Sequence, residues 1–255
     1  RFDENWEVKH DYTETIDGVS VFRGSKYMQS KTGDTFKQAE QFLKQNRKVL
    51  FSGTPCQIVA LKRYLKKEYE NLLLVDFICH GVPSPGVWRK YLKQVIALTC
   101  DKNTVSSHLK LLLSERNALV EGISFRDKRL GWQKYSFSLT LSTTDESGNK
   151  NTVSLSESLN ENLFMRGFLA NLYLRPSCYA CPALGDYWGI SSLMPDYDDD
   201  KGISAISVNT EKGKAVYATL NVDNRSTSYE ALCQRNPSLV RACDIPKNRE
   251  RFFNL

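Results

Sequence analysis

Hydrophobic positions in the first part of the chain switch between helical and strand spacing. Over residues 35–45 they recur every three or four positions, which predicts a helix, and residues 48–52 (KVLFS) are typical of a short buried strand. A second helix is predicted to begin at Pro55, because proline at the first helical position after Thr54 is a common start signal. The pattern therefore predicts a helix, a strand and a helix in direct succession.

The series continues with a second buried strand over residues 72–78 and a helix that begins at Pro85. Alternation of strands and helices favours parallel strands joined by right-handed crossovers, and such sheets bind ligands at the carboxyl ends of their strands. Cys56 and Cys79 follow the two strands at those ends. Their position makes both cysteines candidates for a functional site.

The hydrophobic period changes in the second half of the chain. The alternating residues 122–126, 135–142 and 152–155 predict strands, and the polar residues 145–150 (DESGNK) predict a turn, so a hairpin is expected. A helical pattern follows over about residues 160–173. The sequence thus predicts a mixed α/β fold with a parallel βαβ core, an additional antiparallel β region and flanking helices.

A strand over residues 203–208 and a helix over residues 212–220 are the last elements that the pattern predicts. The beginning of the chain shows no clear period and is interpreted as a lead-in or connector, and the remainder as one functional domain whose pattern allows a division into two sub-regions. The predicted segments are residues 1–30 for the connector, 31–255 for the domain, and 31–115 and 116–255 for the sub-regions.

Composition limits the class of protein. The 255 residues are 41% hydrophobic and 25% charged, which suffices for a buried core and argues against disorder. No apolar run approaches the roughly 20 residues of a bilayer span, so no membrane span is expected. The net charge of +6 is spread among acids. No basic cluster interleaves with aromatic residues as in a single-strand groove, so no nucleic-acid partner is expected.

Seven cysteines add candidate chemistry to this picture. An odd number scattered through a lysine-rich chain is not typical of a secreted disulfide scaffold, so a reducing, cytoplasmic location is expected. Cys178 and Cys181, followed by Pro182, form the sharpest motif, because thiolates separated by two residues can bind one metal ion or two corners of an iron–sulfur cube. A redox dithiol and a chance pair are the alternatives.

Topology suggests the other half of such a site. If the strands before Cys56 and Cys79 are neighbours in a parallel sheet, their ends lie roughly 5 to 10 Å apart, which suits two ligands of one cube. A buried structural role is the alternative for each of them. Cys100, Cys233 and Cys243 have no partner spacing and are interpreted as structural or surface thiols.

The turn formed by Ser52, Gly53 and Thr54 offers backbone N–H groups and the positive end of a helix dipole, which together suit a phosphate or pyrophosphate. It is not a Walker loop, because it lacks the second glycine and the Lys-Ser/Thr pair. An ordinary helix N-cap is the alternative.

His80 follows the second predicted strand and is interpreted as a histidine that is hydrogen-bonded to nearby groups. A role of His80 in proton transfer is the alternative.

Several segments spread over nearly the whole chain carry a family resemblance. They are residues 22–27 (FRGSKY) with Gln29 and Ser30, 51–57 (FSGTPCQ), 79–84 (CHGVPS), 125–132 (FRDKRLGW), 174–179 (LRPSCY), 185–189 (GDYWG), and 202–204 (GIS) with Asn209 and Thr210. In this order the segments resemble the coenzyme F420 hydrogenase/dehydrogenase beta subunit family.

The resemblance implies an iron–sulfur flavoprotein oxidoreductase, which passes electrons between a [4Fe-4S] cluster and FAD for hydride transfer to or from a soluble coenzyme or small molecule. It makes Cys56, Cys79, Cys178 and Cys181 the expected cluster ligands, the same quartet to which spacing and topology point. The expected flavin contacts are Lys26, Gln29, Ser30, Ser52, Gly53, Thr54, Arg126, Lys128, Asp186 and Trp188. No catalytic side chain is assigned.

The resemblance also implies partners, namely a hydride donor or acceptor such as the deazaflavin coenzyme and a ferredoxin-like domain or subunit. The sequence departs from the family between Ala183 and Leu184, where a loop of roughly ten residues is usual. Two other classes stay open as alternatives. One is a degenerate family member that binds a nucleotide or a partner enzyme in glycan biosynthesis, and the other is a structural zinc protein that uses Cys178 and Cys181 with two further thiolates.

Overall fold

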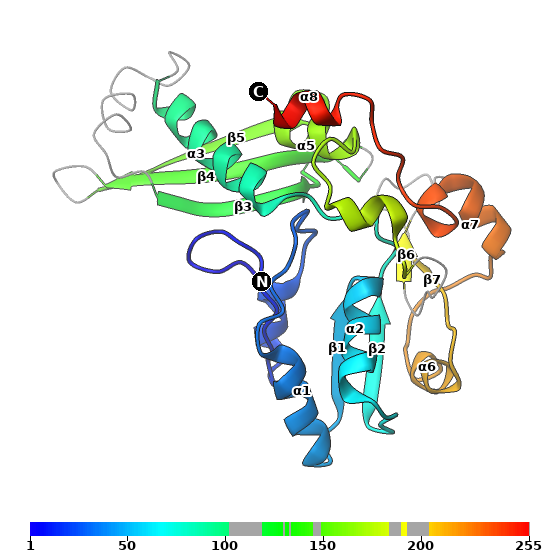
Figure 1. Ribbon diagram of the computed structural model, residues 1–255. Helices are drawn as coiled ribbons and strands as arrows, with labels where there is room; N and C mark the ends of the chain where they lie inside the picture. Colours follow the sequence, from blue (N-terminus) through cyan, green and yellow to red (C-terminus); the bar gives the residue numbers. More distant parts are fainter. Residues whose placement is uncertain are drawn as a thin grey trace.

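The protein, seen in a computed structural model, has two main sheet-containing halves and a further short antiparallel pair of strands over residues 190–192 and 204–206 (Figure 1). A three-stranded antiparallel sheet with helices beside it lies at one end, and a parallel pair of strands with its own helices lies at the other. The predicted mixed α/β fold is therefore confirmed. The structure describes residues 1–101, 119–129, 131–132, 134–144, 149–183, 190–192 and 204–254.

The parallel half forms largely as the pattern predicts. Its elements are α1 (Thr35–Lys44), β1 (Val49–Gly53), α2 (Pro55–Leu65) and β2 (Leu72–Asp76). The strands are parallel neighbours, and Gly53 pairs with Asp76 at their carboxyl ends. The strand predicted over residues 72–78 ends two residues early, because β1 stops at Gly53 and Pro55, which has no N–H group, starts α2.

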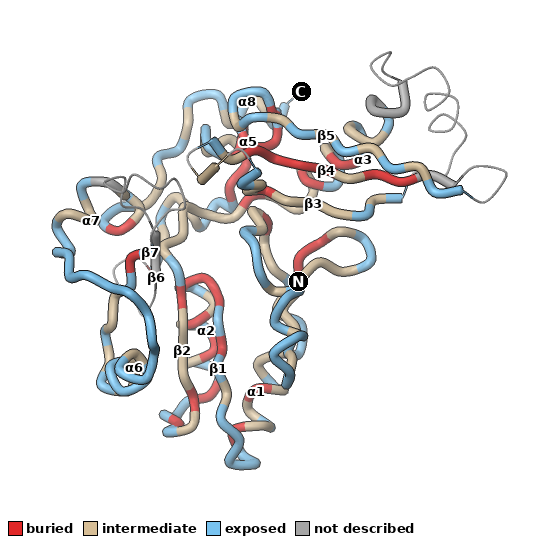
Figure 2. Tube along the Cα trace, turned by 180° about the vertical axis from the view of Figure 1, so that it is seen from behind, coloured by how far each residue is buried: buried red, intermediate tan, exposed pale blue. Residues whose placement is uncertain are grey.

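A small core holds this half together. Side chains from α1, α2 and both strands form one buried cluster, and the start of α2 is fixed by Gln57, whose side chain accepts a hydrogen bond from the Thr54 N–H at 3.0 Å. The cluster is visible as the buried parts of β1 and α2 in Figure 2. Its members are Ala39, Leu43, Phe51, Ile58, Leu61, Leu65, Tyr69 and Leu72.

The antiparallel half confirms the predicted hairpin. Its elements are α3 (Pro85–Asp101), β3 (Leu119–Asp127), β4 (Ser136–Thr144), β5 (Lys150–Ser158) and α5 (Leu163–Leu169). β4 and β5 pair without interruption from Ser136↔Ser158 to Thr144↔Lys150. The strands are longer than predicted, and most of the predicted turn, residues 145–148, lies outside the described residues.

Alternation along β4 sends its apolar side chains to one face of the sheet, where the larger core lies. Trp88 of α3 is fully buried at the centre, with its ring 5.2 Å from Phe125 and 5.0 Å from Phe164. Tilted and edge-on aromatic contacts of this kind stabilise a core beyond their buried area. The cluster consists of Val8, Met28, Trp88, Leu92, Phe125, Phe137, Leu139, Leu141, Phe164, Met165, Phe168, Tyr173 and Leu174.

The helix predicted over residues 160–173 is much shorter in the structure, where α5 spans Leu163–Leu169. Asn162 caps it by accepting a hydrogen bond from the Met165 N–H at 2.9 Å, so the helix cannot begin earlier. At the other end Asn171 has a φ of 60°, a left-handed conformation that ends the helix. The residues after Asn171 are thereby free to form an extended segment.

The rest of the described chain contains only short elements. Three of them lie beyond residue 220, where the sequence pattern predicts the last helix to end. The remaining elements are β6 (Ile190–Ser192), β7 (Ser204–Ile206), α6 (Glu211–Tyr217), α7 (Tyr229–Arg235), the 3-10 helix η3 (Pro237–Leu239) and α8 (Arg249–Phe253). The sequence pattern does not predict α7, η3 and α8, because segments of three to seven residues are too short to show a helical period. β7 and α6 correspond to predicted elements that the structure shortens.

The beginning of the chain is packed against the antiparallel half. It contains the 3-10 helix η1 (Asp17–Phe22) and the buried carboxylate of Glu7, which is paired with both Lys31 and Arg89. Since Arg89 belongs to α3, this cluster joins the beginning of the chain to the larger core. Burial of Glu7 is tolerated because its charge has two cationic partners.

Replacing Glu7 by Gln should lower the free energy of unfolding by about 1 to 3 kcal/mol at neutral pH. The loss stays moderate because the Lys31 and Arg89 side chains are 60% and 61% exposed. Lys31 and Arg89 lower the pKa of Glu7 from its ordinary value of 4.5. The ionised carboxylate of Glu7 therefore stabilises the fold at pH values above its ordinary pKa of 4.5. This contribution to the free energy of unfolding disappears as the pH falls through the lowered pKa of the folded protein.

Urea unfolding measured at several pH values tests this assignment. The E7Q variant and the natural protein should converge in acid, and Glu4→Gln at an exposed neighbouring position should have little effect. Equal stability of the E7Q variant and the natural protein at pH 7 would contradict a stabilising role for the cluster.

Candidate functional site

Cys56 and Cys79 lie where the two parallel strands end. Cys56 is the second residue of α2, directly after β1, and Cys79 is the third residue beyond β2. Because Gly53 pairs with Asp76, the chain leaves both strands at the same edge of the sheet. The topology therefore places both thiols at one end of the parallel pair, as the sequence predicts.

Cys178 and Cys181 lie at the 3-10 helix η2 (Pro176–Ala180) and its C-cap. A short antiparallel pairing holds this region against residues 77–84, the loop between β2 and α3 that contains Cys79 (the Cys79 loop). The Ser84 N–H donates to the Tyr173 carbonyl at 2.8 Å, and the Arg175 N–H donates to the Val82 carbonyl at 2.9 Å. This pairing connects the segment after β2 with the segment before η2. It brings together cysteines that are about a hundred residues apart in the sequence.

The four cysteines form one electrostatic group. Burial, together with the charge that Cys178, Cys56 and Cys181 carry when ionised, raises the pKa of Cys79 from 9.0 to about 12. Burial also raises the pKa of Cys178, with Cys56 and Cys181 acting in the same direction. All four are free thiols, so in this state Cys79 and Cys178 are neutral at pH 7.

Backbone N–H groups at the site favour the charged form of two of these thiols. The Val82 N–H donates to Cys178 Sγ at 3.5 Å, and the Gly81 N–H, which hydrogen-bonds the Cys79 sulfur, opposes the rise of its pKa. Gly81 also permits a close approach, because a Cβ there would lie 2.9 Å from Leu174 and 3.4 Å from Cys178. The loop thus offers donors next to the thiols and packs closely against Leu174 and Cys178.

The spacing of the cysteines bears on what they could hold. Within the described residues, no three His, Cys, Asp or Glu side chains are placed to bind a single metal ion. A tetrahedral ion with sulfur ligands at about 2.3 Å requires sulfur atoms only about 4 Å apart, whereas each thiolate of an iron–sulfur cube binds a different iron atom.

His10 connects two of the segments with predicted flavin contacts, although no motif in the sequence points to it. Its ring nitrogens contact Ser30 Oγ at 2.7 Å and the Ser52 carbonyl at 3.2 Å, and its ring stacks on Phe51. Gln57 Nε2 also donates to the Ser30 carbonyl at 3.3 Å. Ser30, Ser52, Gly53 and Thr54 are thus gathered at the N-terminus of α2.

Arg126 occupies an aromatic environment at the end of β3. Its guanidinium lies 4.2 Å from the Tyr135 ring centre and 5.4 Å from that of Trp132, and its Nε is buried without a hydrogen-bond partner. The Tyr27 ring contacts Phe125 next to Arg126 in the sequence. An unsatisfied buried donor beside aromatic rings is a polar atom that a ligand could satisfy.

The other predicted flavin contacts are placed as follows. Lys26 Nζ donates to the carbonyls of Phe22, Arg23 and Gly24, so its ammonium group is bound by its own loop. Gln29 is half-buried next to Ser30, and Lys128 is exposed just beyond β3. Asp186 and Trp188 lie outside the described residues.

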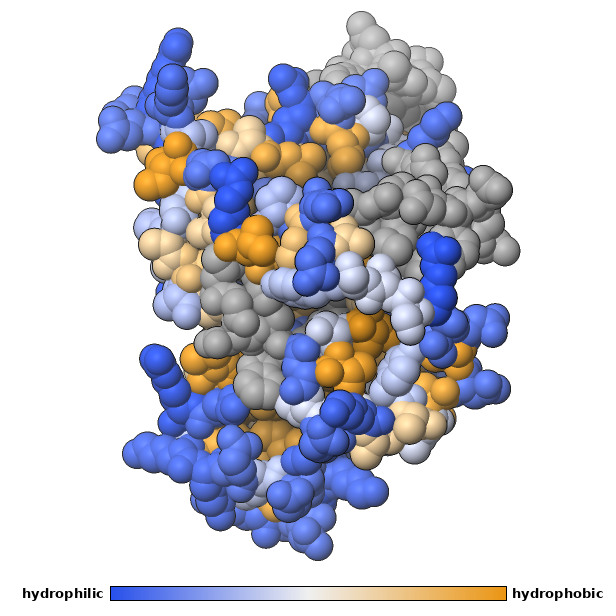
Figure 3. All heavy atoms as spheres, turned by 90° about the vertical axis from the view of Figure 1, so that its right-hand side faces the viewer, coloured by the Kyte–Doolittle hydropathy of each residue, from blue (hydrophilic) through white to orange (hydrophobic). Residues whose placement is uncertain are grey.

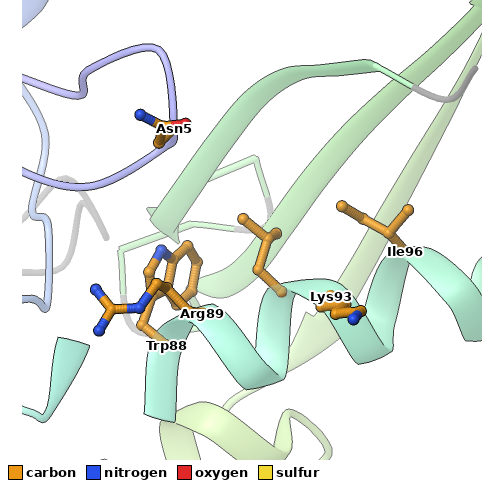
Figure 4. Close-up of a pocket in the computed structure, with 6 residues that line it drawn as sticks. Asn5, Trp88, Arg89, Lys93 and Ile96 are labelled. Carbon is orange, nitrogen blue, oxygen red and sulfur yellow. The ribbon is translucent and has the colours of Figure 1, made fainter. Parts of the chain in front are cut away.

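Of the cysteines that the structure describes, none lines either of two surface cavities. One of about 290 Å³ is formed mainly by α3, with Asn5 facing the helix from the beginning of the chain (Figure 4). Another of about 840 Å³ lies along α8.

Figure 3 shows a face where hydrophilic side chains cover most of the surface and hydrophobic ones form separate patches. No helix in the described part of the chain combines the length and apolarity of a membrane span.

Together the fold and the site define an α/β protein with a group of four cysteines at the end of a parallel strand pair. Residues 46–230 match the family described as the C terminus of the coenzyme F420 hydrogenase/dehydrogenase beta subunit, and this stretch contains all four cysteines. The chain therefore belongs to the coenzyme F420 hydrogenase/dehydrogenase beta subunit family, whose name is that of an oxidoreductase subunit. No curated protein and no solved structure matches the chain.

Replacing Gly81 by Ala should disturb the cysteine site. Gly81 has a φ of 132°, which L-residues rarely adopt, and the new methyl group would meet Leu174 at 2.9 Å. We expect the free energy of unfolding to fall by about 1 to 3 kcal/mol and Cys178 to be alkylated faster. Gly86→Ala is the matched control, because its Cβ would meet no atom within 3.4 Å. Equal stability and labelling of the two variants would contradict this interpretation of the Gly81 contact.

Proposed function

We propose that this protein is an iron–sulfur flavoprotein oxidoreductase, which passes electrons between a [4Fe-4S] cluster and FAD for hydride transfer to or from a soluble coenzyme or small-molecule substrate. The observation that carries the proposal is the grouping of four free cysteines, which come from α2, the loop after β2, and η2 with its C-cap. Family membership supports the same set, since the matched residues include all of them.

Cys56, Cys79, Cys178 and Cys181 would hold the cluster. Their contribution is to bind it in a partly buried site and to exclude water, while the N–H groups of Gly81 and Val82 stabilise negative charge on the sulfur atoms. Because Cys79 and Cys178 are protonated in the free site, binding releases protons to solvent.

FAD would lie along a line of the predicted contacts. Residues 26–30 run from the antiparallel sheet, where Tyr27 contacts Phe125, to the start of α2, where Ser30 contacts His10. The N–H groups and dipole at the start of α2 suit the pyrophosphate, and Arg126 offers its unsatisfied Nε near the other end. When bound, the flavin supplies hydride chemistry and the cluster supplies single-electron transfer.

The proposal includes partners on both sides of the electron path. A soluble hydride donor or acceptor, for which the deazaflavin coenzyme is suggested by the family name, would exchange hydride, and a ferredoxin-like domain or subunit would exchange electrons with the cluster. A cytoplasmic location agrees with oxygen-sensitive cofactors and free thiols.

Protein purified without oxygen should show flavin absorbance and contain about four iron and four sulfide per chain. Cys178→Ser should abolish iron and sulfide binding, because it removes one of four ligands, whereas Cys233→Ser on α7 should leave both unchanged. Metal analysis and absorption spectra measure the outcome. Stoichiometric zinc without flavin would instead indicate a structural zinc protein, and the absence of zinc, iron and flavin would indicate a degenerate nucleotide- or partner-binding member.

Arg126→Gln should weaken flavin binding by about tenfold or more, since it removes the cation with the unsatisfied buried donor. Lys134→Gln, an exposed neighbour, is the matched control for the loss of one positive charge. Flavin titration of the cofactor-free proteins compares the two dissociation constants. Unchanged flavin affinity in a folded Arg126→Gln variant would remove Arg126 from the flavin site.

A further inference from the structure

The C-terminal segment contacts the Cys79 loop through Cys243, a thiol that lies beyond the residues matched by the family. Cys243 Sγ donates to the His80 carbonyl at 2.6 Å and lies 3.8 Å from His80 Nδ1. His80 directly follows Cys79, so the hydrogen bond holds the backbone that carries this cysteine. The sequence pattern gives Cys243 no partner, but the structure places it beside the site.

The same segment contacts the Cys178 region through Arg249 at the start of α8. One guanidinium nitrogen donates to the Leu172 carbonyl at 2.9 Å and to Tyr179 Oη at 2.7 Å. The Arg249 guanidinium also lies 4.9 Å from the Tyr179 ring centre. Because Tyr179 is located between Cys178 and Cys181, these contacts fix the backbone between the two cysteines.

Further contacts keep the segment in place between these two points. Asn171 Nδ2 donates to the Asp244 carbonyl at 3.5 Å, and the rings of Phe252 and Tyr173 lie 5.4 Å apart. Cys243 and Phe252 both pack against the larger core, as do Cys178 and Tyr179. In Figure 1 the chain runs from α7 to α8 over the region that contains η2. One continuous segment therefore touches both cysteine-bearing regions.

We propose that Cys243 and Arg249 are positioning residues, through which the C-terminal segment holds the Cys79 loop and the Cys178–Cys181 region together. Neither residue is a ligand in this assignment. The Cys243 thiol is a hydrogen-bond donor to a carbonyl, and the four thiolates that a cluster requires come from elsewhere. Only the part of the test that uses the cluster rests on the proposed function.

Thiol labelling of the cluster-free full chain tests the contact made by Arg249. Arg249→Ala should speed alkylation of Cys178 and Cys181 by iodoacetamide about tenfold, because a charged hydrogen-bond pair that closes the region is lost. Arg251→Ala is the matched control, since Arg251 belongs to the same helix and is exposed. Peptide mass spectrometry gives the rate for each cysteine. Equal rates in the two variants would overturn the role of Arg249.

A pair of substitutions tests the contact made by Cys243. Cys243→Ser keeps a donor for the His80 carbonyl and should leave the labelling rate of Cys79 close to that of the natural protein, whereas Cys243→Ala should raise it several-fold. Cys233→Ala controls for the loss of a thiol elsewhere. Identical rates in the Ser and Ala variants would show that the hydrogen bond does not position the loop.

Cluster binding supplies an independent readout. After anaerobic reconstitution, Arg249→Ala and Cys243→Ala should shift the midpoint potential of the cluster, and Cys243→Ser should restore it. If the natural protein binds no iron and sulfide, the proposed function fails while the labelling rates still decide the positioning role. If Arg249→Ala does not fold, Arg249→Gln takes its place, and Arg249→Lys, which keeps the charge but loses the planar fork, should show a smaller increase in labelling than Arg249→Gln. Unchanged labelling in Arg249→Gln and in Cys243→Ala would overturn the proposal.

Discussion

The short pairing of residues 82–84 with residues 173–175 is the contact on which the site depends. It consists of an isolated bridge and backbone hydrogen bonds, and it joins the loop that leaves β2 to the segment that leaves α5. Because backbone donors and acceptors must be paired when buried, this contact is specific although it is small. It also links the half around β1 and β2 with the half around β3, β4 and β5. Backbone hydrogen bonds thus bring the cysteines together. The grouping of the thiols does not depend on a bond between the cysteines themselves.

The buried carboxylate of Glu7 and the thiols of the cysteine site differ in how their charge is compensated. The buried carboxylate of Glu7 has its countercharges built in, since Lys31 and Arg89 both pair with it. The thiols have much less compensation: Arg175 lowers the pKa of Cys178, but burial outweighs it. Cys79 and Cys178 are neutral because burial raises the pKa of each thiol, and a neutral thiol needs no countercharge. The protein therefore contains one buried carboxylate that is paired with two cations and two thiols that burial keeps neutral.

Local signals explain what could be predicted from the sequence. The start of α2 at Pro55 and the alternation along β4 depend on neighbours in the chain, so the predicted bounds of both elements are close to the observed ones. The grouping of Cys56 with Cys79 follows from the rule that parallel strands end at one edge. His10 and Cys243 carry no such signal, because their partners lie 42 and 163 positions away and neither sits in a periodic segment. The length of α5 is overestimated from the sequence because a polar run hides the Asn162 cap.

The distance along the chain between these contacts has a consequence for how the protein matures. Val82 and Cys178 are 96 positions apart, and His80 and Cys243 are 163 positions apart. Closing loops of this length costs chain entropy before any contact compensates for it, whereas β1–α2–β2 and the β4–β5 hairpin are local and fold early. The thiols consequently stay apart and accessible through most of folding and during synthesis, until α8 has emerged. A chain interrupted before α8 would lack the contacts that Arg249 makes with Leu172 and Tyr179, and its cysteines would stay accessible to oxidants.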